Sequence, residues 1–183
     1  MNGEFQTPDW VCDLMVNMIP ITDNPKVILE PTPGEGNLVR AIQRRFSQCR
    51  ILAPNDIYLF HPKEKIDWTV SNPPFTPMSL GFSLLQRMKI WCDNIVILLP
   101  WLLLINSEER TDWFLRAGLS EVIHLPRSVF GSSRVQACVM KMTPRRSKEE
   151  PIELTFAAPQ YIKRGGLSQT GAKKTKNLLG VFE

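Results

Sequence analysis

Apolar positions near the start of the chain follow helical spacing and then change to a strand pattern. From Thr7 to Ile19 they recur every three or four residues, with Thr7 as the expected N-cap and Pro8 at the first helical position. A short β-branched run from Lys26 to Leu29 comes next, and a second helical pattern extends from Asn37 to Phe46. The pattern therefore predicts helix, strand, glycine-containing loop and helix.

The middle of the chain repeats this alternation. Strands are predicted from Arg50 to Ala53, from Trp68 to Ser71 and from Ile95 to Leu99, with a helix from Leu80 to Lys89 before the last of them. The first two strands end in polar or proline-containing segments. Strands separated by helices favour a parallel sheet covered on both faces, in which ligands bind at the carboxyl ends of the strands.

The last third of the chain departs from strict alternation. Ser107 is expected to cap a helix that continues through Leu115, and two strands follow, Val122 to Leu125 and Val135 to Met142. We expect these two strands to form an antiparallel pair that completes the sheet, with one more short strand from Leu154 to Phe156. The predicted fold class is α/β: a Rossmann-like, mostly parallel sheet with an antiparallel strand pair at its C-terminal end.

Length and composition agree with a single domain. The 183 residues suit one α/β unit, which we place at 1–164, and a basic, flexible tail at 165–183, where Gly, Ser, Thr and Lys predominate. The apolar run from Ile95 to Ile105 contains Pro100, is about half the length of a membrane span, and is interpreted as a buried strand. No apolar leader opens the sequence, so a cytoplasmic location is expected.

Cysteines and net charge narrow the function only slightly. The four cysteines form no C-x-x-C pair and no cluster with either histidine, so we expect reduced thiols and no metal. A net charge of +4 and a pI near 9.0 are compatible with a polyanionic partner. Much of this excess falls on six residues of the linker and tail: Arg145, Arg146, Lys148, Lys173, Lys174 and Lys176.

The loop from Glu30 to Asn37 carries two glycines between a strand and a helix. Gly34 and Gly36 let the backbone approach a ligand, and the N–H groups at the following helix start would face it. A plain turn and a phosphate-binding loop are alternatives. No Gly-Lys-Ser/Thr follows, and Val39 stands where the third glycine of a dinucleotide-binding loop belongs.

The tetrapeptide Asn72-Pro73-Pro74-Phe75 is the most informative segment. Its two prolines fix the backbone after a β-branched strand and hold Asn72 extended at the strand end. An exocyclic amine of a nucleic-acid base is a poor nucleophile, because its lone pair is delocalised into the ring. The side-chain carbonyl of Asn72 and the backbone carbonyl of Pro73 could both accept hydrogen bonds from it, while Phe75 stacks on the flipped-out base.

Taken together, these segments resemble the S-adenosylmethionine-dependent amino-methyltransferases, in the arrangement common among N6-adenine DNA methyltransferases. Four motifs occur in the family's order over roughly residues 4 to 142. They are Phe5-Gln6-Thr7-Pro8, Glu30-Pro31-x-x-Gly34-x-Gly36, Asn55-Asp56 and Asn72-Pro73-Pro74-Phe75. The resemblance implies a methyl transfer from S-adenosylmethionine to adenine N6 in DNA by direct displacement, without a metal.

The resemblance also assigns cofactor contacts. Phe5 and Thr7 would close over the methionine end, and Glu30, followed by Pro31 and the two glycines, would meet the methionine ammonium. Asp56 would accept hydrogen bonds from the ribose hydroxyls. Only about ten residues separate Asp56 from the next predicted strand. Members of the family usually have a helix and a further strand in this interval. Either the affinity for the cofactor is modest, or Ile57 and Phe60 line a reduced adenosyl pocket.

Residues between the last predicted strand pair are candidates for substrate binding. Arg127, Phe130 and Arg134 lie in that loop, where Arg suits phosphate contact and Phe suits base stacking; a solvated hairpin loop is the alternative. We expect His61 to lie at the surface and His124 to have a structural role.

Several functions remain open at this point. DNA is favoured over RNA as the acceptor, but an RNA adenine methyltransferase, a protein-glutamine methyltransferase and a catalytically reduced binding subunit are all compatible with the motifs. No segment is long enough to be a separate target-recognition domain, so a homodimer or a specificity partner is expected.

Overall fold

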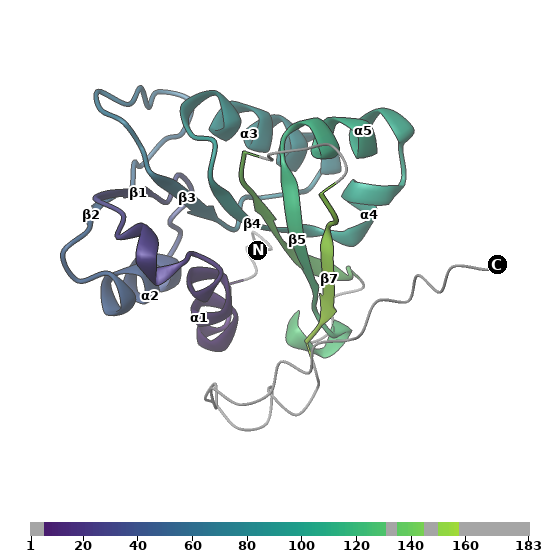
Figure 1. The fold of residues 1–183 in the computed structure, drawn as a ribbon, viewed down its shortest axis with the longest axis horizontal. Helices are drawn as coiled ribbons and strands as arrows, with labels where there is room; N and C mark the ends of the chain where they lie inside the picture. The colour runs from purple at the N-terminus through teal and green to yellow at the C-terminus, as the bar shows by residue number, and fades with distance from the viewer. Residues whose placement is uncertain (1–5, 131–134, 145–149, 158–183) are drawn as a thin grey trace.

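Within the part of the chain that the structure describes, seven strands form one sheet in the order β2-β1-β3-β4-β6-β5-β7 (Figure 1). The computed structural model describes residues 6–130, 135–144 and 150–157. The strands are β1 (Val27–Leu29), β2 (Arg50–Leu52), β3 (Trp68–Ser71), β4 (Ile95–Pro100), β5 (Leu119–His124), β6 (Ala137–Met142) and β7 (Glu153–Phe156).

All strands except β6 run in one direction. β1 pairs in parallel with β2 and β3, and β3 with β4, whereas β6 is antiparallel to both of its neighbours, β4 and β5. The edge strand β7 is parallel to β5. The predicted α/β fold with an antiparallel pair near its C-terminal end is therefore confirmed. The carboxyl ends of β1, β2, β3, β4, β5 and β7 all meet at one edge of the sheet, here called the carboxyl edge.

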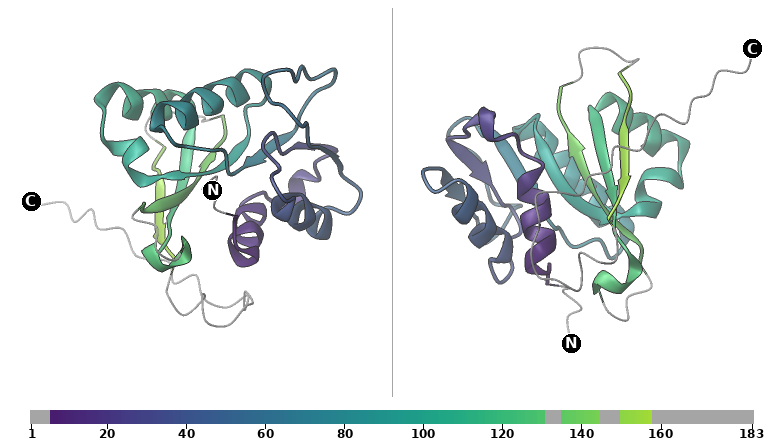
Figure 2. Two further views of the ribbon diagram at one scale, coloured as in Figure 1. Left: turned by 180° about the vertical axis from the view of Figure 1, so that it is seen from behind. Right: turned by 60° about the horizontal axis from the view of Figure 1, so that its bottom comes forward.

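Five α-helices cover the two faces of the sheet (Figure 2). They are α1 (Asp9–Asn17), α2 (Asn37–Arg45), α3 (Met78–Trp91), α4 (Trp101–Ile105) and α5 (Glu108–Arg116), with 3-10 turns η1 (Ile21–Asp23) and η2 (Arg127–Phe130). Buried residues of α1 and α2 pack with Val70 and Leu98 of the sheet, whereas those of α3, α4 and α5 pack with Ile95 and Ile97. Alternate positions along the strands thus supply two apolar cores, as expected for a sheet buried on both faces.

The first helix begins later than the sequence predicts. Pro8 has extended torsion angles (φ −59°, ψ 146°), takes the N-cap position itself and makes no side-chain capping bond. Thr7 is therefore not a cap; its hydroxyl accepts a hydrogen bond from the Asn72 side chain instead. The prediction that Thr7 caps the helix and Pro8 is its first residue was wrong.

The apolar run from Ile95 to Ile105 is divided between two elements. β4 ends at Pro100, and Trp101–Ile105 forms the short helix α4, so the interpretation of the whole run as a buried strand was wrong. Pro100 lacks the N–H that a continuing strand needs and fits at the junction. Ser107 does cap α5, its hydroxyl accepting a hydrogen bond from the Arg110 N–H at 3.4 Å.

Some predictions concern residues that the structure does not describe. Phe5, Arg134 and the 165–183 tail lie outside the described residues. Among the helices of the described part, none combines the length and the apolar character needed to cross a membrane.

Candidate active site

The glycine loop lies at the carboxyl end of β1 and leads directly into α2. Gly34 and Gly36 have positive φ angles of 50° and 80°, the left-handed region that side chains rarely adopt. Glycine at both positions therefore lets the chain turn tightly from Pro31 to the first residue of α2, Asn37. The free N–H groups of that helix start face the same edge of the sheet.

Glu30 is a fully buried carboxyl group at the start of this loop. Its Oε1 atom accepts hydrogen bonds from the Thr32 N–H at 2.9 Å, the Thr32 hydroxyl at 3.2 Å and the Ser71 hydroxyl at 3.1 Å. Its Oε2 atom is buried and has no hydrogen-bond partner among the described residues. Burial raises the pKa of Glu30 to about 7, although these hydrogen bonds favour the ionised form. One carboxylate oxygen is thus held in place and the other is available to a cation.

Asn72 follows β3 at the same edge. Its side-chain Nδ2 donates to the Thr7 hydroxyl at 2.9 Å, which fixes the plane of the amide. Pro73 is buried and Pro74 exposed. Phe75 is half-buried against the α3 side of the core, where a Cβ added to Gly81 would lie 3.0 Å from the Phe75 Cβ. Gly81 therefore allows the tetrapeptide to lie close against α3.

The N-terminal segment joins the two motifs. The backbone carbonyl of Thr7 accepts a hydrogen bond from Asn37 Nδ2 at 2.9 Å, while the Thr7 hydroxyl contacts Asn72. A Cβ added to Gly34 would lie 3.7 Å from the Gln6 side chain, so this segment also passes over the glycine loop. Three segments separated by up to 65 residues along the chain are thereby brought together at the carboxyl edge.

The Asp56 region is less closely tied to this group. Asp56 is exposed, and its carboxylate accepts a hydrogen bond from the Tyr58 N–H in its own loop at 2.7 Å. Ile57 is only 6% exposed and packs into the core under α3. Phe60 packs edge-on against Trp91, with ring centroids 5.3 Å apart. The loop follows β2 at the carboxyl edge, beside the glycine loop.

Two of the predicted substrate-binding residues, Arg127 and Phe130, lie on the other half of the same edge. η2 follows β5 and exposes the Arg127 side chain. Phe130 is half-buried and packs against the core on the α1 side. Both residues thus follow β5 at the carboxyl edge, and their roles in substrate binding stay predictions.

Sequence reasoning missed four residues that hold the site together: Gln6, Thr32, Asn37 and Ser71. Thr32 and Ser71 share a hydroxyl–hydroxyl hydrogen bond of 2.7 Å, and both bind Glu30. A signal existed for Ser71, because a polar residue closing an apolar strand immediately before the tetrapeptide needs a partner. For the others the partners are distant in sequence and the pattern gives no signal.

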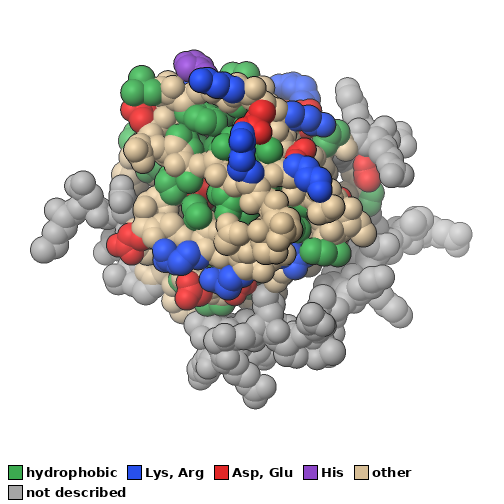
Figure 3. Space-filling model, turned by 90° about the vertical axis from the view of Figure 1, so that its left-hand side faces the viewer, with side chains coloured by type: hydrophobic (Ala, Val, Ile, Leu, Met, Phe, Trp, Pro, Cys, Tyr) green, Lys and Arg blue, Asp and Glu red, His purple; other side chains and the backbone are tan. Residues whose placement is uncertain are grey.

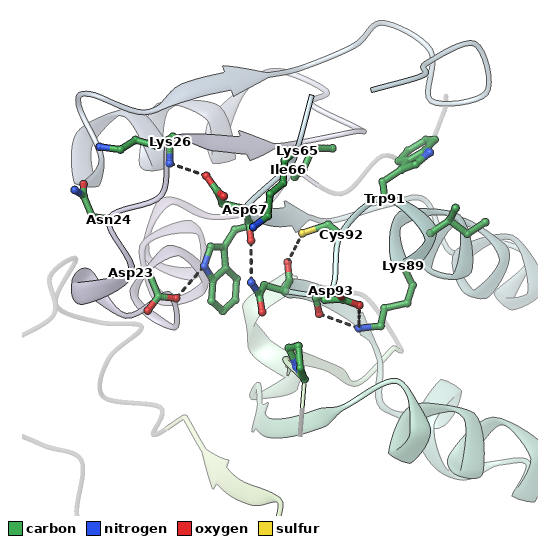
Figure 4. A pocket seen from close by; sticks show the side chains of 14 residues that line it. Asp23, Asn24, Lys26, Lys65, Ile66, Asp67, Lys89, Trp91, Cys92 and Asp93 are labelled. Carbon is green, nitrogen blue, oxygen red and sulfur yellow. Dashed lines mark hydrogen bonds and ion pairs between the residues drawn. The ribbon is translucent and has the colours of Figure 1, made fainter. Parts of the chain in front are cut away.

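A cavity of about 820 Å³ lies at the opposite, amino-terminal edge of the sheet (Figure 4). Its lining includes residues that precede β1, β3 and β4, namely Lys26, Asp67 and Asn94. The polar groups largely satisfy one another: Asp67 accepts hydrogen bonds from the backbone N–H groups of Lys26 and Val27, and Asn94 donates to the Asp67 carbonyl. This arrangement fixes the strand starts, and it lies at the opposite edge of the sheet from the candidate site.

Charge on the surface is mixed. On the face shown in Figure 3, Lys and Arg side chains are interspersed with acidic and hydrophobic ones. Among the described residues, several cations form ion pairs, as in Arg44–Asp13 at 2.7 Å. This face therefore presents no continuous basic patch of the kind that would bind duplex nucleic acid by charge alone.

Strand order, the reversed β6 and the glycine loop after β1 together define the fold of the class I methyltransferases. Solved structures share it at low sequence identity. The methyltransferase subunit of a type I restriction-modification system from Streptococcus thermophilus superposes with a TM-score of 0.66 and 16% identity, over 89% of this chain and 52% of that one.

Two further restriction-modification proteins have the same fold. The M protein of the type I restriction enzyme EcoKI gives a TM-score of 0.58 at 13% identity, over 76% of this chain and 44% of that one. The type IIG restriction endonuclease BpuSI gives a TM-score of 0.60 at 15% identity, over 83% of this chain and 27% of that one. The chain thus spans about half the length of the methyltransferase subunits that it matches. No family model and no curated protein sequence matches it.

Proposed function

We propose that this chain binds S-adenosylmethionine at the carboxyl edge and methylates the exocyclic amino group of a nucleic-acid base, N6 of adenine in DNA. One observation carries the proposal: the acceptor tetrapeptide and the glycine loop are joined side by side through Thr7 and through Glu30. Thr7 binds both Asn72 and Asn37, and Glu30 binds Ser71, the residue before Asn72.

The chemistry of Glu30 fits a cofactor with a methionine ammonium. A carboxylate oxygen that is buried without a partner among the described residues is costly unless a ligand completes its hydrogen bonding. Glu30 would hold the ammonium, the loop through Gly34 and Gly36 would pass along the methionine chain, and Asp56 would bind the ribose hydroxyls. When bound, the cofactor supplies a methyl group already activated by its sulfonium charge.

The remaining catalytic requirement is to hold and polarise the amine. The Asn72 side-chain carbonyl and the Pro73 backbone carbonyl would accept its two N–H groups and favour tetrahedral geometry at nitrogen. The bond from Asn72 Nδ2 to Thr7 fixes the side chain before the base arrives, so little freedom is lost on binding. Phe75, fixed against α3, would stack on the base.

The choice of adenine in DNA rests on the resemblance of the tetrapeptide and its neighbouring motifs. It is supported by the fold shared with restriction-modification methyltransferases. The described residues form only the sheet and its covering helices, so sequence recognition is assigned to a part of the system outside them, such as a partner or a second copy.

The test is methyl transfer from labelled cofactor to separate DNA, RNA and protein acceptors, followed by mass analysis of the modified nucleosides. We expect N6-methyladenine in DNA. Asn72→Ala should reduce incorporation by at least about a thousandfold, because removing a preorganised acceptor at the reacting centre costs several kcal/mol. Cofactor binding, measured by calorimetry, should remain within about threefold of wild type.

Asn94→Ala is the matched control. Asn94 is also half-buried and also donates one side-chain hydrogen bond, to the Asp67 carbonyl at 3.0 Å, but at the amino-terminal edge. The two variants should lose similar stability, while only Asn72→Ala loses methylation. Equal activity of Asn72→Ala and wild type would refute the assignment of Asn72 as the residue that holds the amine. Incorporation into RNA or protein alone would show that DNA is not the acceptor.

A further inference from the structure

Three aromatic rings form a row along the carboxyl edge, beyond the residues used above. Trp101 follows the last residue of β4, His124 is the last residue of β5, and Phe156 is the last residue of β7. The Trp101 and His124 rings meet edge-on with centroids 5.7 Å apart, and the His124 and Phe156 rings are tilted by 45° at 5.3 Å. We call these three residues the aromatic row.

The row starts beside the proposed reaction centre and ends at the edge of the sheet. β4 lies next to β3, after which Asn72 follows, whereas β7 is the outermost strand. With about 5 Å between neighbouring strands, the row crosses the half of the edge that leads away from the tetrapeptide. The backbone N–H of Trp101 donates to the Gln136 carbonyl at 2.8 Å, which holds the backbone at the inner end in place.

The outer ring, Phe156, is largely exposed although it contacts His124. Phe156 is 71% exposed, whereas Trp101 and His124 are half-buried beneath it. Arg127, three residues after His124, exposes its guanidinium at the same edge. Exposed aromatic faces beside a cation are the components with which proteins bind single-stranded nucleic acid, through base stacking and phosphate contact.

We propose that the aromatic row with Arg127 binds the nucleotides flanking the target base, in single-stranded or locally opened form, with Phe156 as a stacking platform. This rests on the proposed function, because it takes the nucleic acid to be the substrate of the same edge. Nucleic acid is taken as the occupant because the exposed Arg127 side chain beside the rings suits a phosphate, and a protein partner is an outcome of the test.

The test is binding of a labelled twelve-nucleotide oligodeoxythymidylate, measured by fluorescence anisotropy at fixed salt. Phe156→Ala should weaken binding about tenfold, the usual effect of removing one stacked base contact. Phe156→Trp, which keeps an aromatic face, should bind within about twofold of wild type. Because the side chain is exposed, neither change should affect folding.

Leu154→Ala is the matched control. Leu154 lies two residues earlier on β7, faces the same side of the strand and is 47% exposed, but it has no aromatic face. It should leave the affinity for the oligonucleotide unchanged. Equal losses in Leu154→Ala and Phe156→Ala, or none in Phe156→Ala, would overturn the proposal. A change in oligomeric mass with unchanged oligonucleotide affinity would do the same and would assign the row to a protein interface.

The proposal and the proposed function fail separately. Suppose that the wild-type protein binds cofactor and methylates DNA, and that Phe156→Ala equals it in both assays and in oligonucleotide binding. Only the proposed role of the aromatic row is then refuted. If the wild-type protein neither binds cofactor nor transfers methyl, but Phe156→Ala still weakens oligonucleotide binding, only the methyltransferase assignment is refuted.

Discussion

Glu30 makes the stability of the protein depend on pH. Burial raises its pKa from 4.5 to about 7, so the folded state binds this proton more tightly than the unfolded chain does. Its favourable contribution to the free energy of unfolding is fully present below pH 4.5. That contribution is lost as the pH rises through 7, and the loss amounts to about 3 kcal/mol at most.

Glu30→Gln should remove this loss. The amide keeps the shape of the side chain but carries no charge, so without cofactor its advantage over wild type should grow between pH 5 and pH 8. We expect the difference in Tm to increase by at least about 4 °C over this range, measured by thermal unfolding. A constant difference would mean that Glu30 is not the group responsible.

The same ionisation should control cofactor binding in the opposite direction. The ammonium requires the ionised carboxylate, so wild-type affinity measured by calorimetry should rise from pH 6 to pH 8. Glu30→Gln should bind weakly at both values. Glu35→Gln, an exposed carboxylate in the same loop, is the control and should follow wild type.

Thr7 shows what sequence alone can say about one residue. A threonine before a proline and an apolar periodic run matches the local rule for an N-cap, and the same residue matches the motif of the resemblance. In the structure its hydroxyl instead accepts a hydrogen bond from the side chain of Asn72, which is 65 residues away. Capping rules consider only neighbours along the chain, so they cannot detect a tertiary competitor for the same oxygen.

At the scale of elements, the loop between β2 and β3 depends on Arg87 of α3. The Arg87 guanidinium lies over the rings of Tyr58 and Trp91, with 5.7 and 5.3 Å to the two centroids. It also donates to the Tyr58 carbonyl at 2.9 Å. Ile57, buried beneath, adds apolar contact. The loop is thereby fastened to α3 beside the predicted ribose ligand, Asp56.

Arg87→Ala should release this loop and weaken cofactor binding. We expect the cofactor Kd to rise about tenfold, with methyl transfer at saturating cofactor nearly unchanged, because the loop positions Asp56 and does not touch the amine. Faster proteolytic cleavage near Tyr58 should accompany the change. Arg87→Lys keeps the charge but not the planar group, so its cofactor Kd should lie between those of wild type and Arg87→Ala.

Gln86→Ala, an exposed neighbour on α3, should behave as wild type in the same assays. If Arg87→Ala changes the rate at saturating cofactor as strongly as the Kd, then Arg87 acts on more than the loop.

The elements themselves were largely predictable, and the errors have physical causes. β3 has the predicted bounds, because a β-branched run that ends in Asn-Pro-Pro has clear limits. The run from Ile95 to Ile105 was misread, since an all-apolar segment has no period that separates strand from buried helix. α3 extends two residues past its predicted limits at both ends, as expected where periodicity fades.

For the whole molecule, topology explains why the site could be placed from sequence and its details could not. β1 pairs in parallel with β2 and β3, so Glu30, Asp56 and Asn72 follow strand ends at one edge, as expected, although no helix separates β2 from β3. The links through Thr7 and Ser71 depend on side-chain packing between distant segments, as does the aromatic row. Neither hydrophobic spacing nor motif order contains that information.

The arrangement of the molecule also predicts a preference among DNA substrates. The described residues form a single sheet with its covering helices, and the face in Figure 3 offers mixed rather than basic charge. The described residues on that face therefore offer few contacts to offset the few kcal/mol needed to extrude a paired base. The 183-residue chain acting alone should methylate a single-stranded oligonucleotide at least about tenfold faster than the duplex of the same sequence.

Pairing energy can be separated from shape by a third substrate, the same duplex with its target adenine opposite an abasic site. This adenine is easier to extrude, so its methylation rate should approach that of the single strand, and Asn72→Ala should be inactive on all three. If the intact duplex is methylated as fast as the other two, the chain itself supplies the contacts that open it. The surface responsible would then have to lie beyond the residues that form the carboxyl edge.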